Sequence, residues 1–543
     1  MAAAKVDGYG EARGIYAFHA YSRFGLIQKG RRRTSNSHVC GFVFSVPSMD
    51  AKTLDPEAQS ARLPDEAVNE EHTAYAPQYD VFWQEPTSED PENPMNWSFR
   101  RKWCIIGMVS FITFLTPLAS SMFAPGITQV LEDFGSTSNL LSTFVVSVYV
   151  LGFAFGPLIV APISEYSGRT WVYNVCNVLF VIFNIASALA PNMASLIVFR
   201  FLDGFAGVAA ITCGSGTIAD LVPREKRGQA MAIWSLGPLF GPIIGPVVGG
   251  FLVEATDWRW VFWVLAIVGG AASVVFLFVV PETYAPIILE RKAARLRKST
   301  NDTAYRSRLD SGIPPKQLFL RSLIRPSKML VLSPVVALMS SYIAVIYGFL
   351  YILFTTFAIV FDGQYGFSAS ASGLSFLGSG VGMLVGLSYV GTLSDRQIRI
   401  KLERKETPVP EDRLPKYLTI PGSLAIPAGL FIYGWSTDKV VHWVVPEIGN
   451  ATTGFGMIVI LMCVQTYLVD AFLAHAASAV AACTVLRSLL GALLPLCGLQ
   501  MYEKLGLGWG NSLLAFLALA MAPIPILFQT WGERLRTKWT IDL

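Results

Sequence analysis

Long runs of apolar residues alternate with short polar segments from Trp103 to the carboxyl end of the chain. A helix needs about twenty apolar residues to cross the hydrocarbon layer of a bilayer, so each run predicts a membrane-spanning helix. A polar stretch from about Glu282 to Lys328 separates the runs into two groups of six. The twelve predicted spans are centred near Ile112, Tyr149, Leu179, Val208, Phe240, Val268, Ser341, Gly382, Ala425, Ile458, Val485 and Leu517. We expect the ninth to be the weakest, because Pro421 and Pro427 interrupt it.

The composition supports a membrane protein. Of the 543 residues, 53% are hydrophobic and only 15% are charged, whereas soluble domains carry about a quarter charged residues. The net charge of +4 is small and does not indicate a nucleic-acid partner. The seven cysteines have neither metal-ligand spacing nor the context of a disulfide framework. No phosphate-binding G-x-x-x-x-G-K-[ST] sequence and no catalytic constellation occurs, so we expect neither an enzyme nor a cofactor.

The polar segments set the predicted domain boundaries. We expect a disordered tail at the amino end, because it is polar and rich in acidic residues and proline. Met49 opens an ordinary acidic tail, so we expect it to be the native start and residues 1–48 to be an artefact of the gene model. The predicted regions are a disordered cytoplasmic tail (1–100), a six-helix bundle (101–281), a linker (282–329), a second six-helix bundle (330–532) and a short cytoplasmic tail (533–543).

Basic residues concentrate in the loops after the second, fourth, sixth and eighth predicted spans, for example Arg169, Arg224 and Arg399. Such loops lie in the cytoplasm, so both termini are predicted to be cytoplasmic in a multi-pass protein of the plasma membrane, with the vacuolar membrane as the alternative. The run from Glu290 to Lys298 has an amphipathic helical pattern. It predicts either an interfacial helix at the membrane surface or a solvated charged linker.

The fifth predicted span contains an unusual glycine and proline pattern. It carries no charge from Gln229 to Val253, and a glycine recurs at every fourth position from Gly237 to Gly249. On a helix these glycines form one ridge without side chains, which lets another helix approach closely. Prolines follow three of them and remove backbone donors, which a bilayer helix tolerates when neighbouring helices compensate. The pattern indicates a transporter helix built for close packing.

Two loops repeat in the two halves of the chain. Residues 161–169 read APISEYSGR after the second span, and residues 391–396 read GTLSDR after the eighth. An acid and an arginine at corresponding places indicate an internal duplication. With RFLDGFAG at 200–207, the glycine run, and DPENPMNW at 90–97, these loops resemble the major facilitator superfamily, specifically its fungal twelve-span drug:proton antiporters. The resemblance implies an all-α membrane fold of two pseudo-symmetric six-helix bundles.

The resemblance also implies roles for the matching residues. Those of the two loops would form a cytoplasmic gate that favours the outward-open state, and Asp220 could pair with Arg169. The glycine run would be the antiporter motif, packed against a helix of the opposite half. The gate residues are Glu165, Gly168, Arg169, Asp220, Gly391, Asp395 and Arg396. The antiporter-motif residues are Gly237, Gly241, Pro242, Gly245, Pro246, Gly249 and Gly250.

Charged residues inside predicted spans need an explanation, because a bilayer makes them unfavourable. Arg200 and Asp203 lie three residues apart and share a helix face, so an Arg–Asp pair could couple transport to protons: protonation of the carboxylate would free the arginine. The resemblance implies that Arg200 takes part in proton coupling, and Asp203 is the second candidate. A structural ion pair is the alternative. Arg487 could balance an anionic substrate or a carboxylate of another helix, or form a fixed structural pair. For Glu447 we favour a water-facing interfacial carboxylate over a proton acceptor, and for Asp470 a helix cap over a ligand.

Many aromatic residues lie in the spans, and a broad, mostly apolar cavity suits amphiphilic small molecules. The candidates for lining it are Trp234, Tyr347, Tyr351 and Arg487. The leading hypothesis is a monomeric, proton-coupled exporter of drugs, toxins or fungal secondary metabolites that works by alternating access. Its partners would be a small-molecule substrate, protons and the lipid bilayer. A polyamine or nutrient carrier of the same fold, or a non-transporting membrane sensor, are the alternatives.

Overall fold

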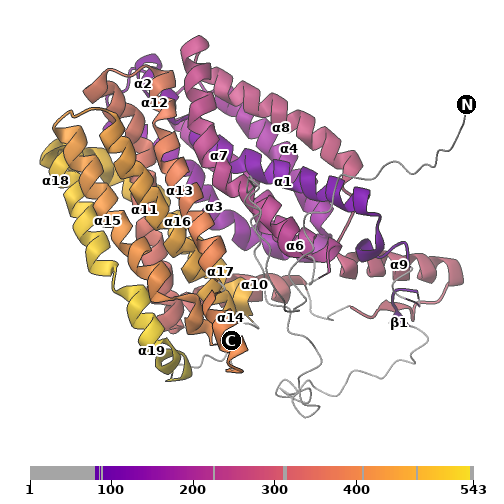
Figure 1. Ribbon diagram of the computed structural model, residues 1–543. Helices are drawn as coiled ribbons and strands as arrows, with labels where there is room; N and C mark the ends of the chain where they lie inside the picture. Colours follow the sequence, from indigo (N-terminus) through magenta and orange to yellow (C-terminus); the bar gives the residue numbers. More distant parts are fainter. Residues whose placement is uncertain are drawn as a thin grey trace, which may run out of the picture. The chain divides into compact units, whose positions relative to one another are not determined.

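The computed structural model describes residues 80–84, 86, 90–223, 227–309, 315–394, 396–406, 409–472 and 475–538, all within one unit of the chain, 42–543. Helices make up almost all of this part (Figure 1). The predicted native start at Met49, the loop residue Arg224 and the gate residue Asp395 lie outside the described residues.

The first half of the chain forms one group of long helices. They are α1 (Phe99–Met122), α3 (Asn139–Ser167), α4 (Arg169–Ala188), α5 (Met193–Gly207) with α6 (Ala209–Leu221), α7 (Arg227–Ala255) and α8 (Arg259–Val279). The second half contributes α11 (Pro334–Tyr365), α12 (Ala369–Leu374) with α13 (Phe376–Leu393), α15 (Lys416–Asp438), α16 (Val444–Ala471), α17 (Ala476–Leu493) and α18 (Gly498–Met521). Shorter elements are η4 (Ala124–Gly126), α2 (Ile127–Asp133), α14 (Arg396–Glu403), η6 (Pro410–Arg413), η8 (Leu494–Cys497) and α19 (Ile524–Lys538).

Eleven helical stretches within the described residues are long and apolar enough to cross a membrane. The last of them, Ser478–Lys538, runs through α17 and α18 and so contains two of the twelve predicted spans. Serines cap several of the long helices: Ser98, Ser138 and Ser333 accept hydrogen bonds from backbone N–H groups of the first turns of α1, α3 and α11.

Prolines do not interrupt these helices. The ninth span, predicted to be weak, is the single helix α15 with Pro421 and Pro427 inside it, and α7 continues through three prolines. Membrane helices tolerate the lost backbone donors because neighbouring helices and local adjustments satisfy the freed carbonyl groups.

The predicted disordered tail ends earlier than residue 100. Asp90 is buried and accepts hydrogen bonds from the backbone N–H groups of Gln84 (2.7 Å) and Glu92 (2.9 Å), and Lys292 lies 3.3 Å away. Burial opposes ionisation of Asp90, but these donors outweigh it and lower the pKa of the carboxyl group. The segment after Asp90 is therefore part of the fold.

The linker between the halves contains two helices, α9 (Ala285–Thr300) and α10 (Pro315–Leu332). The predicted amphipathic helix at 290–298 is α9, and its buried face carries Leu289 and Ala293. A short parallel pair, β1 (Asp80–Val81) with β2 (Arg306–Ser307), joins the segment before α1 to the segment after α9. The placement of α9 at a membrane surface stays a prediction.

Candidate functional site

The glycine ridge of α7 packs against α1 of its own half. A side chain at Gly241 would place its Cβ 2.8 Å from the backbone N of Leu118, and one at Gly249 would collide with the carbonyl of Met122. Gly237 and Gly245 meet the same helix. The expected partner in the opposite half is therefore wrong for the four-residue ridge, because four-residue spacing fixes a helix face but not the helix that covers it.

Other residues of the antiporter motif contact the second half of the chain. A side chain at Gly250 would collide with the carbonyl of Ala369, and one at Gly373 with the carbonyl of Pro246. Further along, Gly380 lies against Ile243. We call these contacts of α7 with α12 and α13 the distal seal. A second contact between the halves joins α3 to α17: the Ser147 hydroxyl donates a 2.8 Å hydrogen bond to the carbonyl of Ala492.

Arg200 of α5 is fully buried among backbone carbonyl groups. Its guanidinium donates to the carbonyls of Val145 (2.8 Å), Ser120 (3.1 Å) and Ala119 (3.4 Å). The rings of Phe123, Tyr149 and Phe262 lie 5.0, 5.1 and 5.7 Å from Cζ, within the range of cation–π interactions. These contacts fix the cation where α1, α3 and α5 meet.

Asp203 shares the predicted helix face with Arg200 and is also fully buried, but no ion pair joins the two side chains. Asp203 Oδ1 accepts a 2.9 Å hydrogen bond from Asn184 Nδ2, and its Oδ2 has no hydrogen-bond partner. The expected Arg–Asp pair does not form because the guanidinium is turned to the backbone carbonyls. A buried carboxyl group with a partnerless oxygen is suited to carrying a proton, since the neutral acid is the form that tolerates such a site.

The predicted pairing of Arg169 with Asp220 is confirmed. Arg169 Nε donates to Asp220 Oδ2 over 2.6 Å, and the guanidinium also fills the space above Gly216. We refer to this end of the bundle as the ion-pair end. Glu165, expected to act with them, is exposed and takes part in no ion pair of the described residues.

Glu282 completes this cluster and was missed by the sequence analysis. Its two carboxylate oxygens accept the backbone N–H groups of Arg169 (3.1 Å) and Thr170 (3.3 Å), the first two residues of α4. Gly168 has a φ of +96° and a side chain there would collide with Glu282, so the motif needs glycine at this position. The signal was a lone carboxylate directly after the apolar sixth span.

The second half has an equivalent ion pair, but residues outside the predicted loop motif form it. Arg413 of η6 donates from Nε to Asp470 Oδ2 over 2.6 Å. Asp470 is thus an ion-pair partner, and the interpretation as a cap is wrong: α17 begins after His475 without a side-chain cap. The loop residues Gly391 and Arg396 are exposed.

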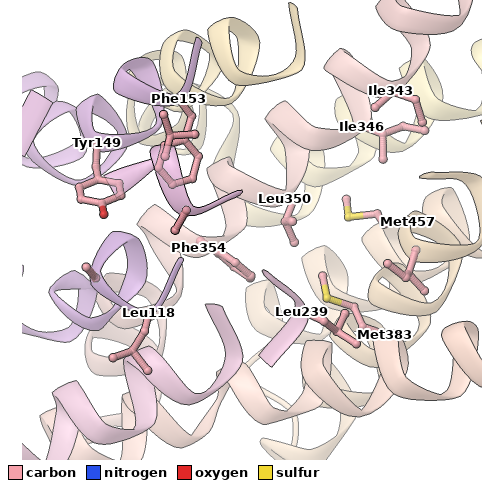
Figure 2. Packing of buried hydrophobic residues seen from close by; sticks show 14 of the residues in the cluster. Leu118, Tyr149, Phe153, Leu239, Ile343, Ile346, Leu350, Phe354, Met383 and Met457 are labelled. Atoms are coloured by element: carbon pink, nitrogen blue, oxygen red, sulfur yellow. The ribbon is translucent and has the colours of Figure 1, made fainter. Parts of the chain in front are cut away.

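A cavity of about 100 Å³ lies between the two halves. Its wall is almost entirely apolar and comes from α7 of the first half and from α11, α13 and α16 of the second. The lining residues are Pro238, Leu239, Pro242, Ile343, Ile346, Tyr347, Leu350, Tyr351, Phe354, Met383, Met457, Ile458 and Leu461. Figure 2 shows Leu239, Leu350, Met383 and Met457 gathered around one region between these helices.

Of the four predicted cavity residues, Tyr347 and Tyr351 line this space. Trp234 does not: its indole N–H donates to Thr113 Oγ1 over 3.0 Å within the first half. The Arg487 guanidinium lies over the Tyr347 ring, with Cζ 5.1 Å from the ring centroid. No carboxylate of the described residues pairs with Arg487, and its Nε is buried without a partner, so a fixed ion pair does not explain it.

Sequence comparison gives a consistent result. The Major Facilitator Superfamily profile matches residues 109–495. The "MFS-type transporter penM" of Penicillium rubens is 54% identical over 84% of this chain and 89% of its own length. The "Efflux pump radE" of Floropilus chiversii is 48% identical over 92% of this chain and 93% of its own length.

Solved structures share the fold at low sequence identity. The inward-open xylose transporter XylE from E. coli superimposes with a TM-score of 0.58 at 16% identity, covering 81% of this chain and all of that chain. A bacterial homologue of the human lysosomal transporter Spinster gives a TM-score of 0.53 at 12% identity, covering 82% of this chain and all of that chain. The arrangement of helices is therefore that of known membrane transporters.

Proposed function

Because the chain belongs to the Major Facilitator Superfamily and resembles its fungal efflux-type members, we propose that it exports small organic molecules in exchange for protons. The cargo class would be drugs, toxins or fungal secondary metabolites. The ion-pair end would face the cytoplasm, as the positive-inside rule predicts for its basic loops, and the distal seal would face outward.

The cavity between the halves carries this proposal. Its wall is shared by α7 of the first half and by α11, α13 and α16 of the second. When two halves rock against each other, a site at their interface opens first to one side and then to the other. The closed distal seal, in which Gly250 and Gly373 allow backbone contact between the halves, fits a state that is shut toward the outside.

Asp203 is the group that we assign to proton coupling. Arg200 donates only to backbone carbonyls and keeps its charge at all accessible pH values, so it cannot exchange a proton during a cycle. Asp203 has one partnerless oxygen and the Asn184 amide beside the other. Arg200 then acts as a fixed positive charge on the same helix face, against which the charge of Asp203 changes.

The lining of the cavity favours an apolar or aromatic cargo with an acidic group. The Tyr347 and Tyr351 rings offer stacking surface, and Arg487 beside Tyr347 supplies a cation that no described carboxylate neutralises. A polyamine carrier would need carboxylates facing its substrate, and the cavity wall contains none among the described residues. We therefore rank a polyamine carrier below an exporter of organic acids and apolar molecules.

Expression in a yeast strain that lacks its own drug pumps tests this function. Cells would be loaded with fluorescein, an anionic aromatic dye, and its efflux followed with and without a protonophore. We expect expression to accelerate efflux and the protonophore to remove most of the acceleration. Efflux that continues unchanged after the proton gradient collapses would contradict proton coupling, and the absence of any transported compound in a wider panel would contradict export.

A further inference from the structure

Glu447 lies at the start of α16, where the sequence favoured a water-facing carboxylate. That interpretation is wrong: its Oε1 is buried and has no hydrogen-bond partner. Its Oε2 lies against the backbone of α13, so close to Gly378 that a side chain there would collide with it. No basic side chain of the described residues forms an ion pair with Glu447. The carboxyl group is thus largely buried without a compensating cation among the described residues.

Two further buried polar groups without partners belong to the same region. Asn450, one helical turn after Glu447, is fully buried with its amide near the Glu447 carboxyl group, yet neither its Nδ2 nor its Oδ1 meets the geometry of a hydrogen bond. Tyr433 of α15 is fully buried, and its hydroxyl also lacks a partner while lying within electrostatic range of Glu447. Buried polar groups are normally satisfied, so such a group of unsatisfied atoms points to a ligand or a change of state.

The helix that covers Glu447 also forms the distal seal. One face of α12 and α13 meets α7 of the other half, with Gly373 on Pro246 and Gly380 on Ile243. Between these two positions, Gly378 contacts Glu447. Gly382, just after them, contacts the backbone of α16. A change of charge at Glu447 therefore acts on the same short piece of chain that closes the distal end.

The two halves place comparable groups in equivalent spans. Asp203 lies in the fourth span of the first half and Glu447 in the fourth span of the second. Each is an acid with one buried, partnerless oxygen, and each has a buried asparagine nearby: Asn184 bonded to Asp203, and Asn450 one turn from Glu447. Asp203 lies about 15 Å along its helix from the first residue and Glu447 only about 5 Å, so Glu447 is nearer the distal end.

We propose that Glu447 is a second proton-binding site of this transporter, on the second half, and that its protonation holds the distal seal closed. In the closed state the group is the neutral carboxylic acid, whose new O–H can donate to the free Oδ1 of Asn450. When the proton leaves to water, the carboxylate needs hydration that the contact with Gly378 excludes. The charged form therefore favours separation of α13 from α16 and loosening of the seal.

This assignment agrees with the direction of exchange. An exporter takes up protons from outside after releasing its cargo, and the protonated protein must then close toward the outside. The inference rests on the proposed function for this physiological meaning. Its test follows conformation alone, so the site and the transport activity can fail independently.

The groups around Glu447 leave few other sources of pH dependence. From α15 the facing titratable group is Tyr433, which also lies within electrostatic range of Tyr365 of α11 and Tyr502 of α18. From α13 only backbone at Gly378 faces the carboxyl group. The η6 segment meets the opposite end of α16, where Arg413 pairs with Asp470. His442, five residues before Glu447, is exposed, and its ring centroid lies 5.5 Å from that of Trp443.

Double electron–electron resonance measures the distance between two spin labels, and on the purified full-length protein in lipid nanodiscs it tests the proposal. Spin labels would be placed at the exposed distal residues Thr256 of the first half and Gln364 of the second, with the accessible Cys104 and Cys497 and the amino-terminal Cys40 replaced by serine. We expect a short distance near pH 5 and a lengthening by roughly 5 Å or more toward about pH 9, the scale of a one-turn displacement. Glu447→Gln should keep the short distance at all pH values.

Two control variants separate Glu447 from its neighbours. Asp362→Asn and His442→Gln remove exposed groups near the same end and should leave the pH response unchanged. Glu447→Asp keeps an acid and should retain a response with a shifted midpoint, which covers the case that the glutamine variant does not fold. A wild-type distance independent of pH, a response that persists in Glu447→Gln or disappears in His442→Gln, or a response to sodium at constant pH would each overturn the proposal.

Discussion

Arg413 Nε donates a 2.6 Å hydrogen bond to Asp470 Oδ2, and this bond repeats the one from Arg169 to Asp220 in atoms and in length. Each arginine comes just before, or at the start of, the third span of its half, and each aspartate near the end of the fourth. The side chains of the first-half pair are 14% and 17% exposed, and Arg413 is 9% and Asp470 33% exposed. Each therefore ties two helices of one half together at the ion-pair end, away from the cavity.

We expect Asp220→Asn and Asp470→Asn each to lower the maximal rate of transport more than the affinity for cargo. The charge that fixes the arginine is lost, while no residue of the cavity wall changes. A shift of roughly 1–3 kcal/mol between the two conformations corresponds to about 5- to 150-fold in their ratio. Initial rates of dye uptake into inside-out vesicles at varied dye concentration would separate the two parameters.

Glu165→Gln is the matched control, because Glu165 is exposed, forms no ion pair within the part of the chain that the structure describes, and belongs to the same loop as Arg169. It should change the rate little. Equal losses of rate and affinity in the Asp220 and Asp470 variants would contradict a purely conformational role.

Gly241→Leu should destabilise the protein by separating α7 from α1. The added Cβ alone would lie 2.8 Å from Leu118 N and 2.9 Å from Pro117 Cβ, and backbone atoms cannot move aside as a flexible side chain can. Overpacking of this kind destabilises by about 1–3 kcal/mol or more. Thermal unfolding followed by fluorescence-detected size exclusion should show the loss. Gly107→Leu, where a Cβ meets no atom within 4 Å, should unfold like the wild type.

How far the sequence predicted these contacts depends on their range. The spans, the duplication and the Arg169–Asp220 pair follow from local patterns: apolar length, repeated loops and charges in matching loops. The glycine ridge was recognised for the same reason, but its partner α1 was not, since periodicity along one helix carries no information about which neighbour covers it.

The orientation of side chains inside the bundle was the second limit. Spacing placed Arg200 and Asp203 on one face but could not show that Arg200 turns to the carbonyls of Val145 and Ser120. The sequence predicted a cap at Asp470 because its partner Arg413 lies 57 residues away in a loop without a recognised motif. Interactions of that sequence separation require the fold.

Asp203→Asn should uncouple transport from protons while the protein still folds. The amide has the size of the acid and can retain a hydrogen bond with Asn184, but it cannot bind or release a proton. In proteoliposomes, the acidification that drives dye transport in the wild type should no longer accelerate the variant. A variant that responds to the pH gradient like the wild type would show that another group carries the proton.

Low pH should loosen the segment around Asp90 from α9. Burial raises the pKa of Asp90. The N–H groups of Gln84 and Glu92 and the Lys292 ammonium together lower this pKa by more, so the folded value lies below the unfolded one. The stabilisation is therefore complete above the unfolded pKa of about 4 and is lost as the pH falls through the lower, folded value. Hydrogen exchange at residues 90–97 should rise in acid, and Asp90→Asn should raise it already at neutral pH. Equal protection in Asp90→Asn and wild type would contradict this.

Arg487 should select cargo by charge. It is the cation behind Tyr347 at the cavity, and no carboxylate of the described residues neutralises it, so an anionic cargo can supply the missing partner. Fluorescein and rhodamine 123 share a xanthene ring and differ in charge, which makes them a matched pair of probes. Arg487→Gln should reduce fluorescein export about tenfold or more, since a charge-assisted hydrogen bond contributes roughly 1.5–3 kcal/mol, and should leave rhodamine export equal or higher. Arg487→Lys should restore part of the fluorescein export, because the charge remains while the planar fork is lost. Equal loss of both dyes in Arg487→Gln would assign Arg487 to the structure of the cavity wall instead of to cargo recognition.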